Sequence, residues 1–92
     1  MLKILIADDS DVMRDRLREL ISEVPGMEIV GEAANGTEAL TASKRLEPDV
    51  VILDIRMPGG NGIDTLRAIK GRRPAPVVIM LTAFPYPQHR QR

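Results

Sequence analysis

The sequence predicts an α/β fold built on a doubly wound parallel β-sheet, and three observations support this fold class. Short apolar runs that end at turn-forming residues are typical of strands buried on both faces of a parallel sheet; Val-Val-Ile-Leu-Asp at residues 50–54 is one of them. These runs alternate with segments of helical periodicity, which implies right-handed crossover connections. The chain has 92 residues, of which 43% are hydrophobic, so we expect one small domain with an aliphatic core.

The first elements in chain order are a strand, a helix and a second strand. Leu-Lys-Ile-Leu-Ile-Ala at residues 2–7 predicts the first strand. Apolar residues then recur at helical spacing through residues 13–24, and either Ser10 or Asp11 can cap this helix. Residues 27–33 predict a shorter strand with one face exposed.

The second half of the chain repeats this alternation. Asn35 followed by Glu38 resembles a capping arrangement, and the helix that it opens ends before Pro48. The Val-Val-Ile-Leu-Asp strand comes next, and a glycine-rich loop and a helix with apolar residues between 63 and 69 follow it. Residues 77–81 predict the last strand, so the expected order is β-α-β-α-β-α-β.

The composition excludes several classes of protein. Thirteen acidic side chains balance thirteen basic ones, so no overall charge favours nucleic acid or a membrane surface as a partner. The absence of cysteine excludes disulfides and thiolate metal sites, and it fits a reducing compartment. No apolar run approaches the length of a membrane span. We therefore expect a cytoplasmic protein with no membrane partner.

Four polar side chains lie where strands are expected to end. Asp8 and Asp9 follow the first strand, Asp54 ends the third, and Thr82 follows the fourth. If the first and third strands are neighbours, as in a flavodoxin-like strand order, these residues line one crevice. Closely spaced carboxylates repel one another, and a hard cation such as Mg²⁺ relieves that repulsion. Such a site suits phosphoryl transfer, with Asp54 as the nucleophile and Thr82 as a donor to phosphate.

Each of these residues also has a simpler interpretation. Asp8 and Asp9 by themselves could equally form a helix cap or a turn, and Thr82 could simply end a strand. Arg56 lies beside the predicted site, where it could contact phosphate or point to solvent. His89, the only histidine, lies in a basic tail and is best interpreted as a surface residue. The combination of the acid pair with Asp54 and Thr82 favours the functional interpretation.

Three segments together resemble the receiver domain of bacterial two-component response regulators. They are Ile-Ala-Asp-Asp-Ser at residues 6–10, Leu-Asp-Ile-Arg-Met-Pro-Gly-Gly-Asn-Gly at residues 53–62, and Met-Leu-Thr-Ala at residues 80–83. The resemblance implies a flavodoxin-like fold that transmits a signal by a change of conformation and is not an enzyme. It also implies a sensor histidine kinase as the partner that supplies the phosphoryl group.

The resemblance assigns a role to each candidate site residue. Asp54 would be the phosphoacceptor, and Thr82 would be the switch hydroxyl that contacts the phosphoryl group. Mg²⁺ would be bound by Asp54 and directly by Asp9, by Asp8 through water, and by the backbone carbonyl of Arg56.

The sequence departs from the family pattern after the fourth strand. Complete receivers have a fifth strand that ends in a lysine and then a fifth helix, whereas Lys3, Lys44 and Lys70 all precede the fourth strand here. We therefore expect residues 1–92 to form a single receiver domain that is truncated after the start of its fourth helix, with four of the five βα units. The fourth strand would be an uncovered edge, which predicts a homodimer through this edge or by exchange of elements. Nucleic acid would be a partner only through an output domain that is not present here.

Two other functions remain open from the sequence. A degenerate or truncated receiver could serve as a non-phosphorylated dimerisation or interaction module, and it would show no labelling of Asp54 by acetyl phosphate. A Mg²⁺-dependent phosphatase could also use an aspartyl-phosphate, but no second acid stands two residues after Asp54, where such enzymes usually place a general acid.

Overall fold

The fold alternates strands and helices along the chain, as the sequence predicts. The structure is a computed structural model, and it describes residues 1–55 and 62–81. Within these residues the elements are β1 Leu2–Ala7, α1 Asp11–Ser22, β2 Met27–Ala33, α2 Gly36–Leu46, β3 Val50–Asp54, α3 Gly62–Lys70 and β4 Val77–Leu81. The predicted α/β class is confirmed.

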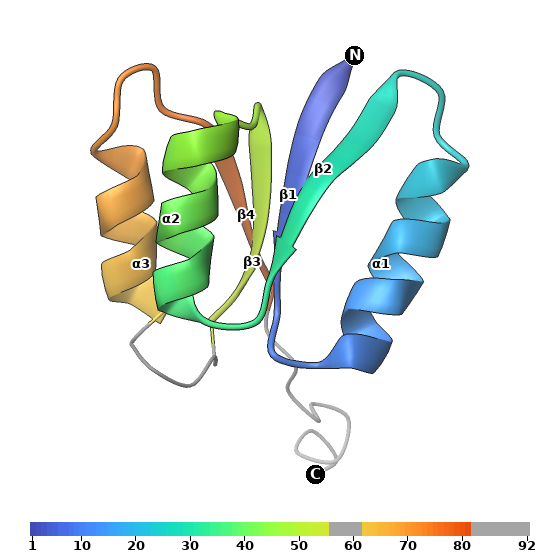
Figure 1. The fold of residues 1–92 in the computed structure, drawn as a ribbon, viewed down its shortest axis with the longest axis horizontal. Helices are drawn as coiled ribbons and strands as arrows, with labels where there is room; N and C mark the ends of the chain where they lie inside the picture. The colour runs from blue at the N-terminus through green and yellow to red at the C-terminus, as the bar shows by residue number, and fades with distance from the viewer. Residues whose placement is uncertain (56–61, 82–92) are drawn as a thin grey trace, which may run out of the picture.

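The four strands form one parallel sheet in the order β2-β1-β3-β4. This is the order of a flavodoxin-like sheet, and it makes β1 and β3 neighbours with Ala7 opposite Leu53. On the far side of β3, Asp54 pairs with Leu81 of β4. Because all four strands are parallel, their carboxyl ends lie together at one end of the sheet, which we call its carboxyl edge (Figure 1).

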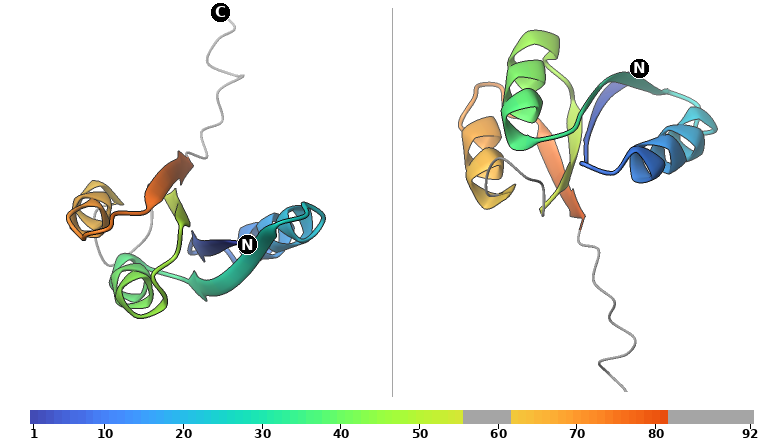
Figure 2. Two further views of the ribbon diagram at one scale, coloured as in Figure 1. Left: turned by 90° about the horizontal axis from the view of Figure 1, so that it is seen from above. Right: turned by 60° about the horizontal axis from the view of Figure 1, so that its bottom comes forward.

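Helices cover both faces of the sheet (Figures 1 and 2). Helix α1 packs on β1 and β2 on one face, while α2 and α3 lie side by side on the other face. The strand β1 alternates between them: Ile4 and Ile6 are buried towards α1, and Leu5 and Ala7 belong to the core beneath α2 and α3. This burial on both faces explains why the central strands are continuous apolar runs.

Side-chain caps start the first two helices. The Oγ of Ser10 accepts a hydrogen bond from the backbone N–H of Met13 at 3.1 Å, so Ser10 is the N-cap and Asp11 lies in the first turn. The side chain of Asn35 accepts from the N–H of Glu38 at 2.8 Å, and the Glu38 carboxylate accepts from the N–H of Ala34 at 2.9 Å. The capping arrangement predicted for α2 is confirmed.

Large apolar side chains remain exposed on α1 and on β4. Leu20 of α1 is 66% exposed, and Val77 and Ile79 of β4 are 59% and 48% exposed. Val77 and Ile79 remain exposed because α1 packs on β1 and β2 of the sheet and leaves β4 uncovered (Figure 2). Within the described residues β4 is an edge strand of the sheet, as the sequence predicts, and β2 is the edge strand on the other side. Among these residues no helix is long and apolar enough to cross a membrane.

Candidate metal-binding site

Three carboxylates meet at the carboxyl edge of the sheet. Asp54 is the last residue of β3, and Asp8 and Asp9 follow the end of β1. Each offers a carboxylate oxygen, and these oxygens lie within 4.8 Å of one another. The cluster forms because β1 and β3 are parallel neighbours that end in register. The juxtaposition predicted from the sequence is therefore present in the structure.

The three acids differ in their surroundings. Asp8 and Asp54 are buried, with 5% and 8% of their surface exposed, while Asp9 is exposed. Burial raises the pKa of Asp8, and the nearby charges of Asp54 and Asp9 raise it further. A hydrogen bond from the backbone of Ser10 and the charge of Arg14 oppose this shift of the pKa. The ionised form of Asp8 thus carries an energetic cost that a bound cation would offset.

The backbone around Asp8 is held on two sides. Its N–H donates to the carbonyl of Ala33 at the end of β2, at 3.0 Å, and its Oδ1 accepts from the N–H of Ser10 at 2.9 Å. The carbonyl oxygen of Asp8 accepts from the guanidinium of Arg14 at 2.5 Å. The segment after β1 is therefore tied to both β2 and α1.

A close backbone approach supports the segment after Asp54. A β-carbon on Gly62, the first residue of α3, would lie 2.5 Å from the carbonyl oxygen of Ile55. Only glycine allows α3 to begin this close to the chain that leaves β3. The sequence marks Gly62 as a loop former, but the contact depends on tertiary packing and has no sequence signal of its own.

The donor set fits a hard divalent cation. Carboxylate oxygens are the ligands that Mg²⁺ prefers, and it is commonly bound by one or two carboxylates together with phosphate oxygens and water.

Two further predicted site residues, Arg56 and Thr82, lie outside the described residues. Arg14 of α1 is not among the residues predicted for the site, because helical spacing shows only that it lies off the apolar stripe of its helix.

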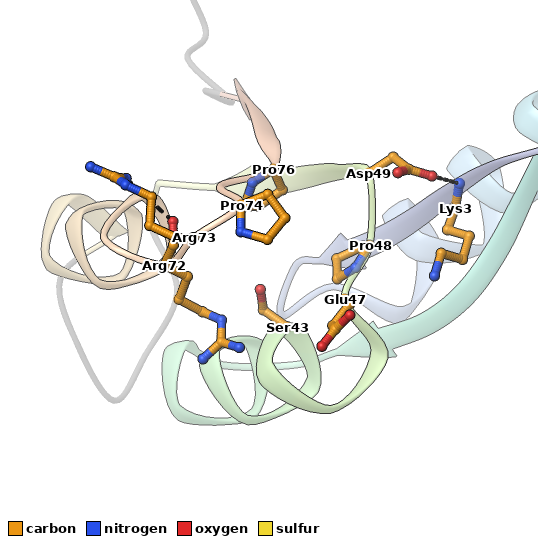
Figure 3. Close-up of a pocket in the computed structure, with 9 residues that line it drawn as sticks. All are labelled: Lys3, Ser43, Glu47, Pro48, Asp49, Arg72, Arg73, Pro74 and Pro76. Atoms are coloured by element: carbon orange, nitrogen blue, oxygen red, sulfur yellow. Dashed lines mark hydrogen bonds between the residues drawn. The ribbon is translucent and has the colours of Figure 1, made fainter.

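A hollow lies at the end of the sheet where the strands begin, opposite the acidic cluster (Figure 3). It has a volume of about 250 Å³ and is lined by Lys3, Ser43, Glu47, Pro48, Asp49, Arg72, Arg73, Pro74 and Pro76. Basic and acidic side chains are mixed around it, and the carboxylate of Asp49 accepts from the backbone N–H of Lys3 at 2.8 Å. We interpret this contact as a link between β1 and the start of β3, remote from the acidic cluster.

Comparison with known families decides what kind of domain carries this cluster. The model of the response regulator receiver domain matches residues 4–92. The chain belongs to this family. The resemblance of the three sequence segments is thereby confirmed, and the sheet order corresponds to the first four strands of the flavodoxin-like receiver fold.

Individual relatives agree with this assignment. The receiver domain of Thermotoga maritima CheB superposes with a TM-score of 0.81 at 41% identity, over 89% of this chain and 60% of that one. CheY in the CheX–CheY–BeF3–Mg²⁺ complex of Borrelia burgdorferi gives a TM-score of 0.83 at 33% identity, over 96% of this chain and 66% of the solved chain.

A curated relative extends the comparison to a longer protein. The protein-glutamate methylesterase/protein-glutamine glutaminase of Alkalilimnicola ehrlichii is 44% identical over 82 residues, which are 89% of this chain and 21% of that protein. The chain spans only about a fifth of this relative's length. The activity in the relative's name is therefore a statement about that longer protein and not about this chain.

Proposed function

We propose that this receiver domain accepts a phosphoryl group on Asp54 from a sensor histidine kinase, with Mg²⁺ as cofactor, and relays the signal by a change of conformation. The observation that carries the proposal is the buried carboxylate of Asp54 at the edge of a receiver sheet, with oxygens of Asp8 and Asp9 within 4.8 Å. The domain is then a substrate of phosphorylation and not an enzyme. The kinase partner and the cytoplasmic location remain predictions from the sequence.

The proposed transfer needs one nucleophile and charge neutralisation. A carboxylate oxygen of Asp54 forms a bond to phosphorus while the bond from phosphorus to the donor imidazole nitrogen breaks, and the electron pair stays with that nitrogen. When bound, Mg²⁺ supplies positive charge to the transferring oxygens. Asp54 and Asp9 would hold the ion directly and Asp8 through water. The similar structure from Borrelia burgdorferi is a CheX–CheY complex that contains BeF3 and Mg²⁺, which supports Mg²⁺ as the cofactor.

Two residues complete the proposed site. The backbone carbonyl of Arg56 would be a further ligand of Mg²⁺, because Arg56 follows Asp54 by only two positions. The hydroxyl of Thr82 would donate to a phosphoryl oxygen, because Thr82 directly follows β4 and β4 pairs with the strand that ends at Asp54. Residues 1–92 would act together as one receiver unit.

Intact-mass spectrometry after incubation with acetyl phosphate tests the proposal. We expect the mass of one phosphoryl group to be added in the presence of Mg²⁺, and no addition with a chelator or in Asp54→Asn. Asp64→Asn is the matched control, because Asp64 is an exposed acid in the first turn of α3. An unlabelled wild-type protein with the circular dichroism of a folded domain would overturn the proposal.

One observation favours a second function, a dimerisation surface on β4. In the described part of the chain β4 is one of the two edge strands of the sheet, and its Val77 and Ile79 are 59% and 48% exposed. Exposed apolar edge strands pair readily with a second chain, so we propose a homodimer through β4 or by exchange of elements.

Light scattering during gel filtration tests this second proposal. We expect the mass of a dimer for the wild type and of a monomer for Ile79→Lys, with Glu28→Lys at an exposed position of β2 as control. A monomeric wild type at micromolar concentration would refute it. If the dimer forms and Asp54 takes no label, the chain is the non-phosphorylated interaction module.

A further inference from the structure

Arg14 of α1 joins three parts of the domain next to the acidic cluster. Its Nη1 donates to the backbone carbonyl of Asp8 at 2.5 Å, and its Nε donates to Oε1 of Glu32 on β2 at 3.2 Å. Its Nη2 forms an ion pair with Asp11 in the first turn of α1. The side chain of Arg14 is only 15% exposed, so it is packed against the rest of the domain and does not extend into solvent.

The carbonyl that Arg14 holds belongs to the peptide bond between Asp8 and Asp9. That peptide unit is planar, so fixing its oxygen also fixes the direction in which the backbone enters Asp9. The N–H of Asp8 is held from the other side by the carbonyl of Ala33. Arg14 and β2 together therefore set the positions from which both acids present their carboxylates.

Glu32 orients Arg14 and provides an internal comparison. Its Oε1 accepts from Arg14, and its Oε2 accepts from Nε of Arg18 at 3.0 Å. Arg18 forms ion pairs with Glu32 and Asp15, and neither of these contacts reaches the segment after β1. The two arginines thus share one acceptor on β2, but only Arg14 extends to the carbonyl of Asp8.

The charge of Arg14 and its hydrogen bonds act on a cation in opposite directions. A fixed positive charge near the acids repels a divalent ion, so removal of the charge alone would tighten metal binding. Loss of the hydrogen bond to Asp8 releases the backbone that places the acids, which weakens metal binding. The sign of the change in affinity therefore separates the two effects.

We infer that Arg14 is a positioning residue that sets the cation affinity of the Asp8, Asp9 and Asp54 site by holding the peptide between Asp8 and Asp9. The inference rests on the proposed function, because it concerns the metal that this function uses. It assigns to Arg14 a purpose beyond helix stability. A guanidinium is suited to this positioning role, because its five N–H donors lie in one plane and can reach a carbonyl and two carboxylates at once.

Electron paramagnetic resonance of free Mn²⁺ tests the inference without any phosphorylation step. Mn²⁺ is the probe because it takes oxygen ligands in an octahedral arrangement as Mg²⁺ does. The dissociation constant is measured for wild type, Arg14→Ala, Arg14→Lys and the matched control Arg18→Ala. We expect both Arg14 variants to bind about 10-fold more weakly, the lower end of the effect of outer contacts on metal sites. Arg18→Ala should stay within about 2-fold of wild type.

Each outcome decides between the alternatives. Unchanged or tighter Mn²⁺ binding by Arg14→Ala, with normal binding by the wild type, would overturn the inference and leave Arg14 as a charge or a helix contact. Equal weakening by Arg18→Ala would also overturn it, because general loss of stability would then be the cause. If Arg14→Ala does not fold, Arg14→Lys decides, since it keeps the charge but not the three-way contact. A folded wild type that binds no Mn²⁺ would instead overturn the metal site of the proposed function.

Discussion

Replacement of Asp8 by asparagine is expected to stabilise the domain in the absence of metal. Asp8→Asn removes one charge from the cluster but keeps the shape and an Oδ1 that can accept from the N–H of Ser10. Two unit charges separated by 4.8 Å, the outer distance between these carboxylate oxygens, repel by about 0.9 kcal/mol in water and about 3.5 kcal/mol at an effective dielectric constant of 20. Because Asp8 and Asp54 are both buried, we expect the free energy of unfolding to rise by about 1–3 kcal/mol at pH 7.

The pH dependence of this gain follows from the raised pKa of Asp8. The folded protein holds the Asp8 proton more tightly than the unfolded chain, whose pKa is near 3.8. The stability that this proton confers is complete below pH 3.8 and is lost as the pH rises through the higher pKa of the folded state. The advantage of Asp8→Asn should therefore be present at pH 7 and vanish below pH 3.8, where wild-type Asp8 is protonated.

Urea unfolding followed by circular dichroism measures this effect. The wild type and Asp8→Asn are compared at pH 7 with a chelator, at pH 3, and at pH 7 with Mg²⁺, which should stabilise the wild type more than the variant. Glu28→Gln is the control, because Glu28 is an exposed acid at the start of β2, and it should change stability by less than about 0.5 kcal/mol. An Asp8→Asn variant that is no more stable than the wild type at pH 7 without metal would refute the repulsion argument.

Three further substitutions, measured by urea or thermal unfolding, test the structural contacts that hold the residues around the acidic cluster in place. Ser10→Ala should cost about 1 kcal/mol, because the N–H of Met13 loses its cap, and Ser10→Asn should restore most of this; equal stability of all three proteins would contradict the cap. Gly62→Ala should cost about 2 kcal/mol, because its β-carbon would meet the backbone oxygen of Ile55 at 2.5 Å, and an unchanged melting temperature would exclude this close approach. Leu53→Ala should lower the free energy of unfolding by about 3 kcal/mol, because Leu53 is fully buried beside Asp54 and its removal leaves a cavity. A loss below about 1 kcal/mol would show that the neighbouring side chains move in to fill that cavity.

The order and bounds of the strands along the chain could be predicted because their sequences are apolar on both faces. Val50–Asp54 and Val77–Leu81 are continuous apolar runs that stand out between turn-forming residues, although β4 leaves Val77 and Ile79 exposed. The meeting of Asp8 with Asp54 could also be predicted, since strand order alone brings the ends of β1 and β3 together. Local hydrogen bonding likewise predicts the cap of α2, which depends only on Asn35 and Glu38.

Contacts between elements could not be predicted in this way. The hydrogen bond of Arg14 to the carbonyl of Asp8 depends on how α1 docks against β1 and β2, and helical periodicity shows only that Arg14 lies off the apolar stripe. That periodicity also does not reveal that Leu20 remains exposed, because burial depends on what the helix meets. The approach of Gly62 to Ile55 is set by the packing of α3, for which one glycine in a glycine-rich loop gives no specific signal.

The most direct test of the central claim is to identify which acid carries the phosphoryl group. Borohydride reduces an acyl phosphate on aspartate to homoserine, which peptide mass spectrometry can assign to one position after treatment with acetyl phosphate and Mg²⁺. The proposed function predicts homoserine at position 54, with Asp8 and Asp9 unchanged. Homoserine at either of those two positions, or at none of the three in a folded protein, would contradict it.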